Sequence, residues 1–311
     1  MEEKGTELNK WAAEQIAPDI SAIPGGFAER FNRYFADSSY AAHEKKILEC
    51  AHYLATKWEF DIIYDMCRSY YGIEHTRHEI DSKLHTIENV PCFDAFLRNN
   101  NYQGFVSLLG ELRFQQRWSR SPRIPATSVI GHMLTVAILS YLCSCETNSC
   151  PRRAVNNFLG GLFHDIPEVL TRDIVSPVKN SVKGLDELIK HIEQEQVERV
   201  LYPLIPQEWQ KEIAYYTNDE FSDKIIKDGN IIYTNTDEIN RLYNSDAYMA
   251  VDGGIIRACD HLSACVETYL SHTCGITTHT LQNGNRELYE KYRNAKIGGI
   301  DFGCLFDYFR I

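Results

Sequence analysis

The chain has 311 residues, 44% of them hydrophobic and 24% charged, with a formal net charge of −11 and a pI near 5.5. This composition is that of an ordinary globular protein and excludes a fibrous or wholly disordered chain. The acidic balance, without a basic stripe, argues against binding to extended nucleic acid, whereas a small anion can still bind where a metal and arginines reverse the local field.

The first hundred residues predict helices, because apolar residues recur at three- and four-residue spacing through 41–64 and 93–97. The polar stretch 98–101 is the candidate boundary, and we expect a helical N-terminal region of unknown role over 1–108. Histidines are frequent there: His43, His52, His75, His78 and His85. No acidic or thiol partner accompanies them at a recognisable spacing, so we interpret them as surface residues rather than a metal site.

The remaining residues, 109–311, predict a second helical region with a C-terminal tail. Helical periodicity runs through four segments: 132–142, 154–163, 185–201 and 255–270. Alternating strand patterns are scarce, and we expect the polar stretch 217–237 to be a loop or a short exposed helix. The fold class is therefore all-α, a helical bundle with an additional helical N-terminal region.

No uninterrupted apolar run approaches the roughly 18 residues of a membrane span, and the N-terminal segment lacks the apolar core of a signal peptide. We therefore expect a cytoplasmic protein with no membrane partner, whose ten cysteines are reduced thiols. Three of these form a C-x-C-x4-C cluster: Cys143, Cys145 and Cys150. Without a second matching pair, we interpret them as packing residues rather than a zinc site.

Three apolar helices each carry a residue that can bind a metal. His132 begins one helix, His164 and Asp165 end another, and Asp260 lies one turn into a third. A polar group in such a helix costs several kcal/mol unless something compensates. Two imidazoles and two carboxylates suit one divalent ion with positions left for water and a substrate oxygen, and manganese, cobalt, iron, zinc and magnesium all accept such ligands. The pattern favours hydrolysis.

The order H…HD…D in helices resembles the HD superfamily of metal-dependent phosphohydrolases. The Arg117-Trp118 pair, His132, the segment 164–179 (HDIPEVLTRDIVSPVK) and the segment 258–267 (ACDHLSACVE) are similar to YfbR-type bacterial 5′-deoxynucleotidases. This resemblance covers residues 111–270. It implies an HD-domain bundle, a small nucleotide as substrate and a homodimer, and it leaves the first hundred residues without a role.

The resemblance implies that one divalent metal is held by four side chains: His132, His164, Asp165 and Asp260. Glu168 matches the catalytic carboxylate, which can deprotonate a water that the ion has acidified. The alternative is that Glu168 is only a favourable charge at a helix N-terminus after Pro167. The implied reaction releases phosphate from (deoxy)nucleoside 5′-monophosphates by attack of a metal-bound hydroxide.

Four positions match substrate-binding residues of the family. Arg117 matches the arginine that contacts the phosphate, where a planar bidentate donor also offsets charge in the transition state. Trp118 and Asp173 match residues near the sugar, with a core anchor and a helix cap as their structural alternatives. Lys179 also matches; it either adds positive charge or is a solvated surface lysine.

One departure from the family concerns the residue before the first histidine. Gly131 stands where the nucleotidases commonly have an acidic residue. A metal-ligating imidazole usually donates its other N–H to a carboxylate or a carbonyl, so we expect a backbone carbonyl to be the partner of His132.

Two other functions stay open. The first is a non-catalytic, nucleotide-binding or regulatory HD protein, against which the presence of all four ligands and Glu168 argues. The second is a di-iron HD oxygenase, which needs additional histidines before Asp260. Between Asp165 and Asp260 the chain has only His191, which leaves too few histidine ligands for a two-metal centre.

Overall fold

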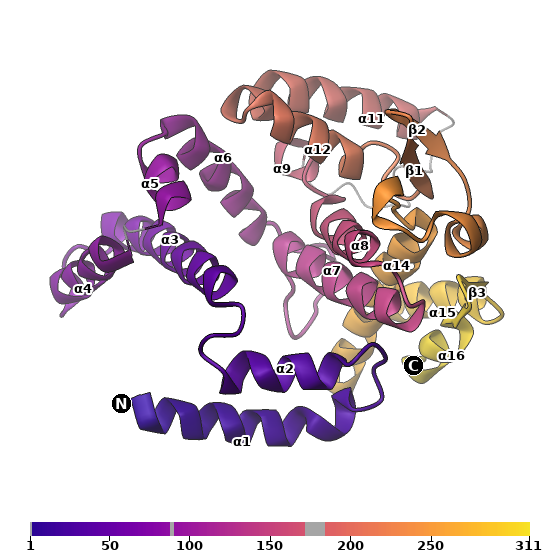
Figure 1. Ribbon diagram of the computed structural model, residues 1–311, viewed down its shortest axis with the longest axis horizontal. Coiled ribbons are helices and arrows are strands. Elements are labelled where there is room, and N and C mark those ends of the chain that lie inside the picture. Colours follow the sequence, from indigo (N-terminus) through magenta and orange to yellow (C-terminus); the bar gives the residue numbers. More distant parts are fainter. Residues whose placement is uncertain (1, 88–89, 172–183) are drawn as a thin grey trace. The chain divides into compact units, whose positions relative to one another are not determined.

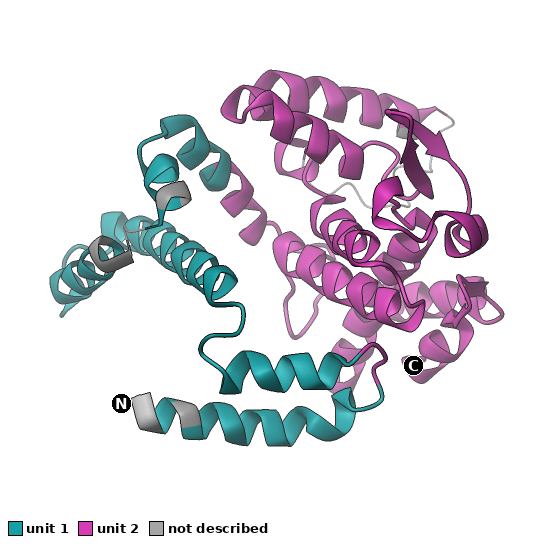
Figure 2. Cartoon of the chain, in the orientation of Figure 1, with its two compact units in different colours: residues 1–22, 26–107 teal, residues 23–25, 108–311 magenta. Residues whose placement is uncertain are grey.

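The computed structural model describes residues 2–87, 90–171 and 184–311, which are mainly helical (Figure 1). Strands occur among them only as two small antiparallel hairpins, so the predicted all-α class is confirmed. The chain divides into two compact units, residues 1–22 with 26–107 and residues 23–25 with 108–311 (Figure 2). That the regions 1–108 and 109–311 are separate domains stays a prediction.

The first unit is built from paired helices. Its elements are α1 (Glu2–Ile20), α2 (Phe27–Ala36), α3 (Ala42–Met66), α4 (Ile73–Ile87), α5 (Pro91–Leu97) and most of α6 (Asn100–Gly110). Helix α1 packs against α2, and α3 against α4. A small core of Cys50, Leu84, Val90 and Phe93 forms around α3, α4 and α5. The helices expected at 41–64 and 93–97 are thus present.

The second unit contains the helices that carry the candidate site. Its helices are α7 (Val129–Glu146), α8 (Pro151–Phe163), α9 (Glu168–Thr171), α11 (Leu185–Gln196), α12 (Gln207–Thr217), α13 (Thr236–Glu238), α14 (Gly253–Thr273), α15 (His279–Tyr292) and α16 (Phe302–Tyr308). Short 3-10 turns occur at Glu111–Arg113, Tyr202–Leu204 and Asp246–Tyr248, and π-helical turns at Val197–Leu201 and Ile239–Tyr243. The four segments predicted from periodicity lie in α7, α8, α11 with its following π turn, and α14.

Helices α7, α8 and α14 pack against one another around an apolar core. The approach of α8 to α7 depends on Gly161, because a Cβ there would lie 2.9 Å from the Cα of Ala137. Helices α7 and α8 form a hairpin with a short connection, so the end of α8 returns to the start of α7. This packing carries His164 back to His132, and the two rings lie edge to face with centroids 5.6 Å apart.

The stretch 217–237 is not only a loop. Strands β1 (Lys224–Lys227) and β2 (Asn230–Tyr233) pair in antiparallel register around a turn at Asp228 and Gly229, whose φ angles are 52° and 76°. The expectation of a loop or a short helix was wrong here, because an Asp-Gly pair between apolar residues is a hairpin signal. A second, minimal hairpin joins β3 (Lys296–Ile297) to β4 (Ile300–Asp301).

Helix α7 is long and apolar enough, by length and composition, to cross a membrane, with 18 residues and a mean hydropathy of 1.5. By that measure the expectation that no segment approaches a membrane span was wrong. However, its polar residues His132, Ser140 and Ser144 are all buried inside the second unit. We therefore interpret α7 as the core helix of this unit.

Candidate metal centre

The four candidate ligands meet at one place in the second unit. The ligand atoms of His132, His164 and Asp165 all lie within 4.8 Å of one another. Asp260 joins them from α14, with its Oδ1 3.0 Å from Nε2 of His132. Nε2 of His164 is 3.2 Å from Oδ2 of Asp165. Side chains from α7, from the end of α8 and from α14 therefore form a single His/Asp cluster.

The donor set fits a divalent cation. Nε2 of His132 and Nε2 of His164 are buried, and neither has a hydrogen-bond partner among the described residues. Carboxylate oxygens nevertheless lie 3.0 and 3.2 Å from them. Buried polar atoms normally find hydrogen-bond partners, so close approach without hydrogen-bond geometry is what we expect of ligands directed at a common ion.

The second nitrogen of each imidazole is held by a different kind of partner. Nδ1 of His164 lies 2.8 Å from the carbonyl oxygen of Gly161. Nδ1 of His132 instead lies 3.1 Å from Oγ of Ser263 and 3.6 Å from Oε1 of Glu267. The expected backbone carbonyl at His132 was therefore wrong. Neither Ser263 nor Glu267 was expected from the sequence, although both follow the candidate ligand Asp260 in α14 at helical spacing, three and seven residues later.

Charge interactions within the cluster change the pKa values of its residues more than burial does. Burial alone would lower the pKa of His164, but the carboxylates of Asp165 and Asp260 raise that pKa to about 9. Burial would raise the pKa of Asp165 and of Asp260, yet the imidazoles of His132 and His164 bring both below their usual value. Both carboxylates are therefore ionised at neutral pH, whereas His164 is protonated and would release its proton when a cation binds.

Glu168 lies beside the cluster. It is the first residue of α9, only 7% exposed, and with His164 and Asp165 it lines a cavity of about 380 Å³. Most charged residues on the rest of the wall are acidic, including Glu193 and Asp219. A buried carboxylate next to candidate metal ligands fits a general base. Its place at the start of α9 also fits the alternative that Glu168 is only a favourable charge at a helix N-terminus.

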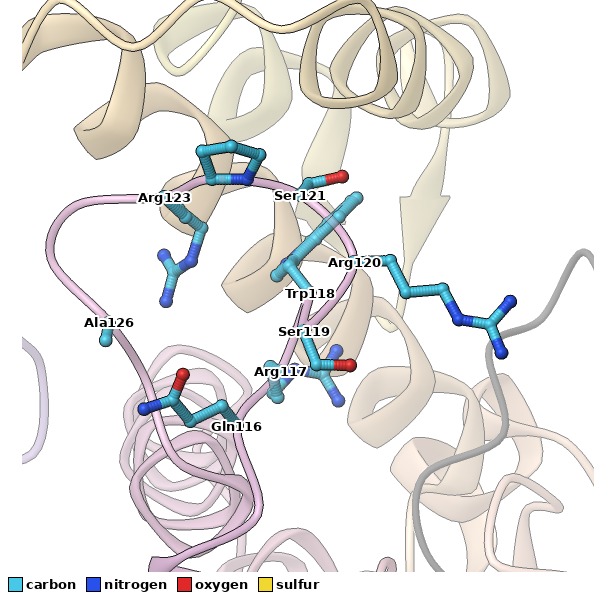
Figure 3. Close-up of a pocket in the computed structure, with 9 residues that line it drawn as sticks. Gln116, Arg117, Trp118, Ser119, Arg120, Ser121, Arg123 and Ala126 are labelled. Atoms are coloured by element: carbon cyan, nitrogen blue, oxygen red, sulfur yellow. The ribbon is translucent and has the colours of Figure 1, made fainter.

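Arg117 also lies beside the cluster, on the loop before α7. Its Nη1 is 3.9 Å from Oδ2 of Asp165, and its Nε is 3.6 Å from Oε2 of Glu267. The loop encloses a second cavity of about 430 Å³, to which Arg120 and Arg123 also contribute (Figure 3). In Figure 3 the side chain of Arg120 extends away from the loop. The guanidinium group of Arg117 beside the cluster fits the binding of a phosphate.

The remaining substrate-binding predictions have mixed outcomes. The indole N–H of Trp118 donates to Oε2 of Glu267 over 2.8 Å, which anchors the ring. Contact of Trp118 with a sugar stays a prediction. Asp173 and Lys179 lie outside the described residues.

The other histidine and cysteine candidates lie apart from the cluster. His191 is on α11, its side chain is 70% exposed, and its Nε2 is 3.4 Å from Oε1 of Glu195. It therefore offers nothing to a two-metal centre. Sγ of Cys143 lies 3.7 Å from Sγ of Cys259 in the core, which agrees with a packing role. Within the described ranges, the three clustered cysteines belong to no group that could hold a metal.

Comparison with known proteins agrees with this geometry. The profile of the family described as HD domain matches residues 109–289, which is more than half of the chain. A 5′-deoxynucleotidase of Photobacterium profundum is 29% identical over 116 residues, 35% of this chain and 58% of that protein. A 5′-deoxynucleotidase of Pasteurella multocida is 29% identical over 122 residues, 38% of this chain and 62% of that protein. The chain thus spans about three fifths of the length of these relatives.

Proposed function

Because this chain belongs to the HD domain family, we propose that it is a metal-dependent phosphohydrolase that releases phosphate from (deoxy)nucleoside 5′-monophosphates. The convergence of His132, His164, Asp165 and Asp260 is the observation that carries this proposal. The names of the 5′-deoxynucleotidase relatives support a nucleotide as the substrate.

The four side chains of the cluster would hold one divalent ion. Bound there, the ion supplies Lewis-acid chemistry, which withdraws electron density from a phosphate oxygen and makes water a better nucleophile at neutral pH. Manganese, cobalt, iron, zinc and magnesium all suit two imidazoles and two carboxylates.

Glu168 and Arg117 have different roles in the proposed reaction. Glu168 accepts the proton of the attacking water, whose oxygen forms the new bond to phosphorus. The bond between phosphorus and the 5′ oxygen breaks, and the nucleoside leaves after its oxygen takes up a proton. Arg117 holds the phosphate and offsets the negative charge that grows on its oxygens.

The charge around the cluster supports this division. Arginines line the loop cavity that contains Arg117, whereas carboxylates dominate the cavity that contains Glu168. The arginines of the first cavity attract an anion, and Glu168 in the second cavity removes a proton from water. This separation would allow a chain with a net charge of −11 to accept a phosphate ester.

The proposal is tested by removing metal with a chelator, reloading with each divalent ion and measuring phosphate release from a panel of ribo- and deoxyribonucleoside 5′-monophosphates. We expect release that depends on the ion, with one ion per chain. Tight nucleotide binding without release over hours would favour the non-catalytic alternative. Two irons per chain with consumption of dioxygen would favour the oxygenase.

A further inference from the structure

Glu267 is a buried carboxylate on α14, and only 4% of this residue is exposed. Its Oε2 accepts the indole N–H of Trp118 at 2.8 Å and lies 3.6 Å from Nε of Arg117. Its Oε1 lies 3.6 Å from Nδ1 of His132. A buried carboxylate is unfavourable unless it is paired, and the partners of this one are a candidate metal ligand, the candidate phosphate-binding residue Arg117 and its neighbour Trp118.

Helix α14 places three functional groups on one face. Asp260, Ser263 and Glu267 follow the spacing i, i+3, i+7, so they line one side of the helix. His132 meets all three, with Nε2 at Asp260 and Nδ1 at Ser263 and Glu267. Since residue 131 is glycine, the groups that face Nδ1 of this imidazole come from α14: the hydroxyl of Ser263 at 3.1 Å and the carboxylate of Glu267 at 3.6 Å.

The same carboxylate holds the loop that carries Arg117. Trp118 has a φ of 57°, an unfavourable conformation for a residue with a side chain, and such conformations persist only when the surroundings enforce them. The bond to Glu267 is one such constraint. Gly284 is another, because a Cβ there would lie 3.1 Å from the Trp118 ring. Nη1 of Arg123 also donates to the main-chain oxygen of Glu267 at 3.2 Å.

We infer that Glu267 is a positioning residue that couples His132 to Arg117, so that the metal site and the phosphate site are ordered by one carboxylate. This inference rests on the proposed function. Because one oxygen of Glu267 lies 3.6 Å from His132 and the other lies 3.6 Å from Arg117, loss of this charge should weaken the binding of both ligands. Coupling of this kind is reciprocal, so each ligand should order the site for the other.

The test is the variant Glu267→Gln, which keeps the shape of the side chain and removes its charge. We measure the affinity for Mn²⁺ from the free ion seen by electron paramagnetic resonance, and the affinity for inorganic phosphate at saturating Mn²⁺. We expect both affinities to fall about tenfold. Glu287→Gln, an exposed residue of α15, is the matched control and should change neither.

A second variant keeps the inference testable if Glu267→Gln folds poorly. Trp118→Phe removes the indole N–H together with the ring that carries it, and it should weaken Mn²⁺ binding in the presence of Glu267, although Trp118 is not a ligand. In the Glu267→Gln background it should have no additional effect. Wild-type Mn²⁺ affinity in Trp118→Phe alone, wild-type affinities for both ligands in Glu267→Gln, or additive effects of the two variants would overturn the inference. Absence of Mn²⁺ binding by the wild-type protein would instead refute the proposed function.

Discussion

Nε2 of His132 lies 3.0 Å from Oδ1 of Asp260, which joins the first turns of α7 to α14 at the candidate metal centre. His132 is fully buried in this unit, and both residues lie on helices that pack in its apolar core. Asp260 is therefore a candidate ligand whose loss would act directly on His132.

Asp260→Asn should lower the affinity for Mn²⁺ by at least about tenfold. The amide keeps the shape of the side chain but removes one of the negative charges that attract the ion. Metal content per chain after dialysis against Mn²⁺, measured by elemental mass spectrometry, reports the change. Glu290→Gln, an exposed residue of α15, is the control. Full occupancy in Asp260→Asn would remove Asp260 from the ligand set.

Glu168→Gln should reduce the rate of phosphate release by about 10²–10⁴-fold, the usual contribution of a general base. Metal binding should be retained, because Glu168 lies beside the cluster rather than in it. The comparison variant is Glu195→Gln, whose side chain on α11 is 64% exposed. If Glu168→Gln released phosphate at the wild-type rate, only the helix-charge interpretation would survive.

Arg117→Lys should raise KM for a nucleotide by about tenfold or more, since hydrogen bonds to charged groups contribute about 1.5–3 kcal/mol. Lysine keeps the charge but lacks the planar pair of donors that matches two phosphate oxygens. Steady-state kinetics at saturating metal measure the effect, with Arg286→Lys on the surface of α15 as control. An unchanged KM would argue that the phosphate binds elsewhere.

Gly161→Ala should destabilise the second unit by about 1–3 kcal/mol, the usual range for overpacking a core. The added methyl group would lie 2.9 Å from the backbone of Ala137, and backbone cannot move aside as a flexible side chain can. Thermal unfolding followed by circular dichroism measures the loss. Gly5→Ala, where a Cβ meets nothing within 4 Å, should not destabilise the chain.

Lys224 gives a stability effect that depends on pH. This residue is only 2% exposed, and its Nζ donates to the carbonyl oxygen of Asn218 at 2.7 Å. Burial lowers the pKa of Lys224 to about 8 from its usual 10.5. Between these two values the unfolded chain binds more protons than the folded chain. Raising the pH through this window therefore stabilises the fold, and below pH 8 the penalty for the buried charge is present in full.

Lys224→Met should abolish this rise in stability. Denaturant unfolding of wild type and variant at a series of pH values from 7 to 10.5 isolates the contribution, since other groups titrate in both proteins. Parallel pH profiles for the two proteins would show that Lys224 titrates normally in the folded state.

The helices and the candidate ligands could be predicted from sequence because both leave local signals. Apolar residues at helical spacing located α7, α8 and α14, and His132, His164, Asp165 and Asp260 interrupt or end those apolar runs. The β1–β2 hairpin also had a local signal in Asp228-Gly229, but four-residue strands are too short for alternation to stand out.

Tertiary structure alone decided what surrounds the ligands. In the sequence Glu267 is an acidic residue near the middle of a long helix, where such residues usually face water. Only the packing of α14 against α7 and against the loop of Arg117 shows that it is buried between them. Local spacing determines which residues share a helix face, whereas the partners of that face depend on contacts between distant segments, and these form only when the chain folds.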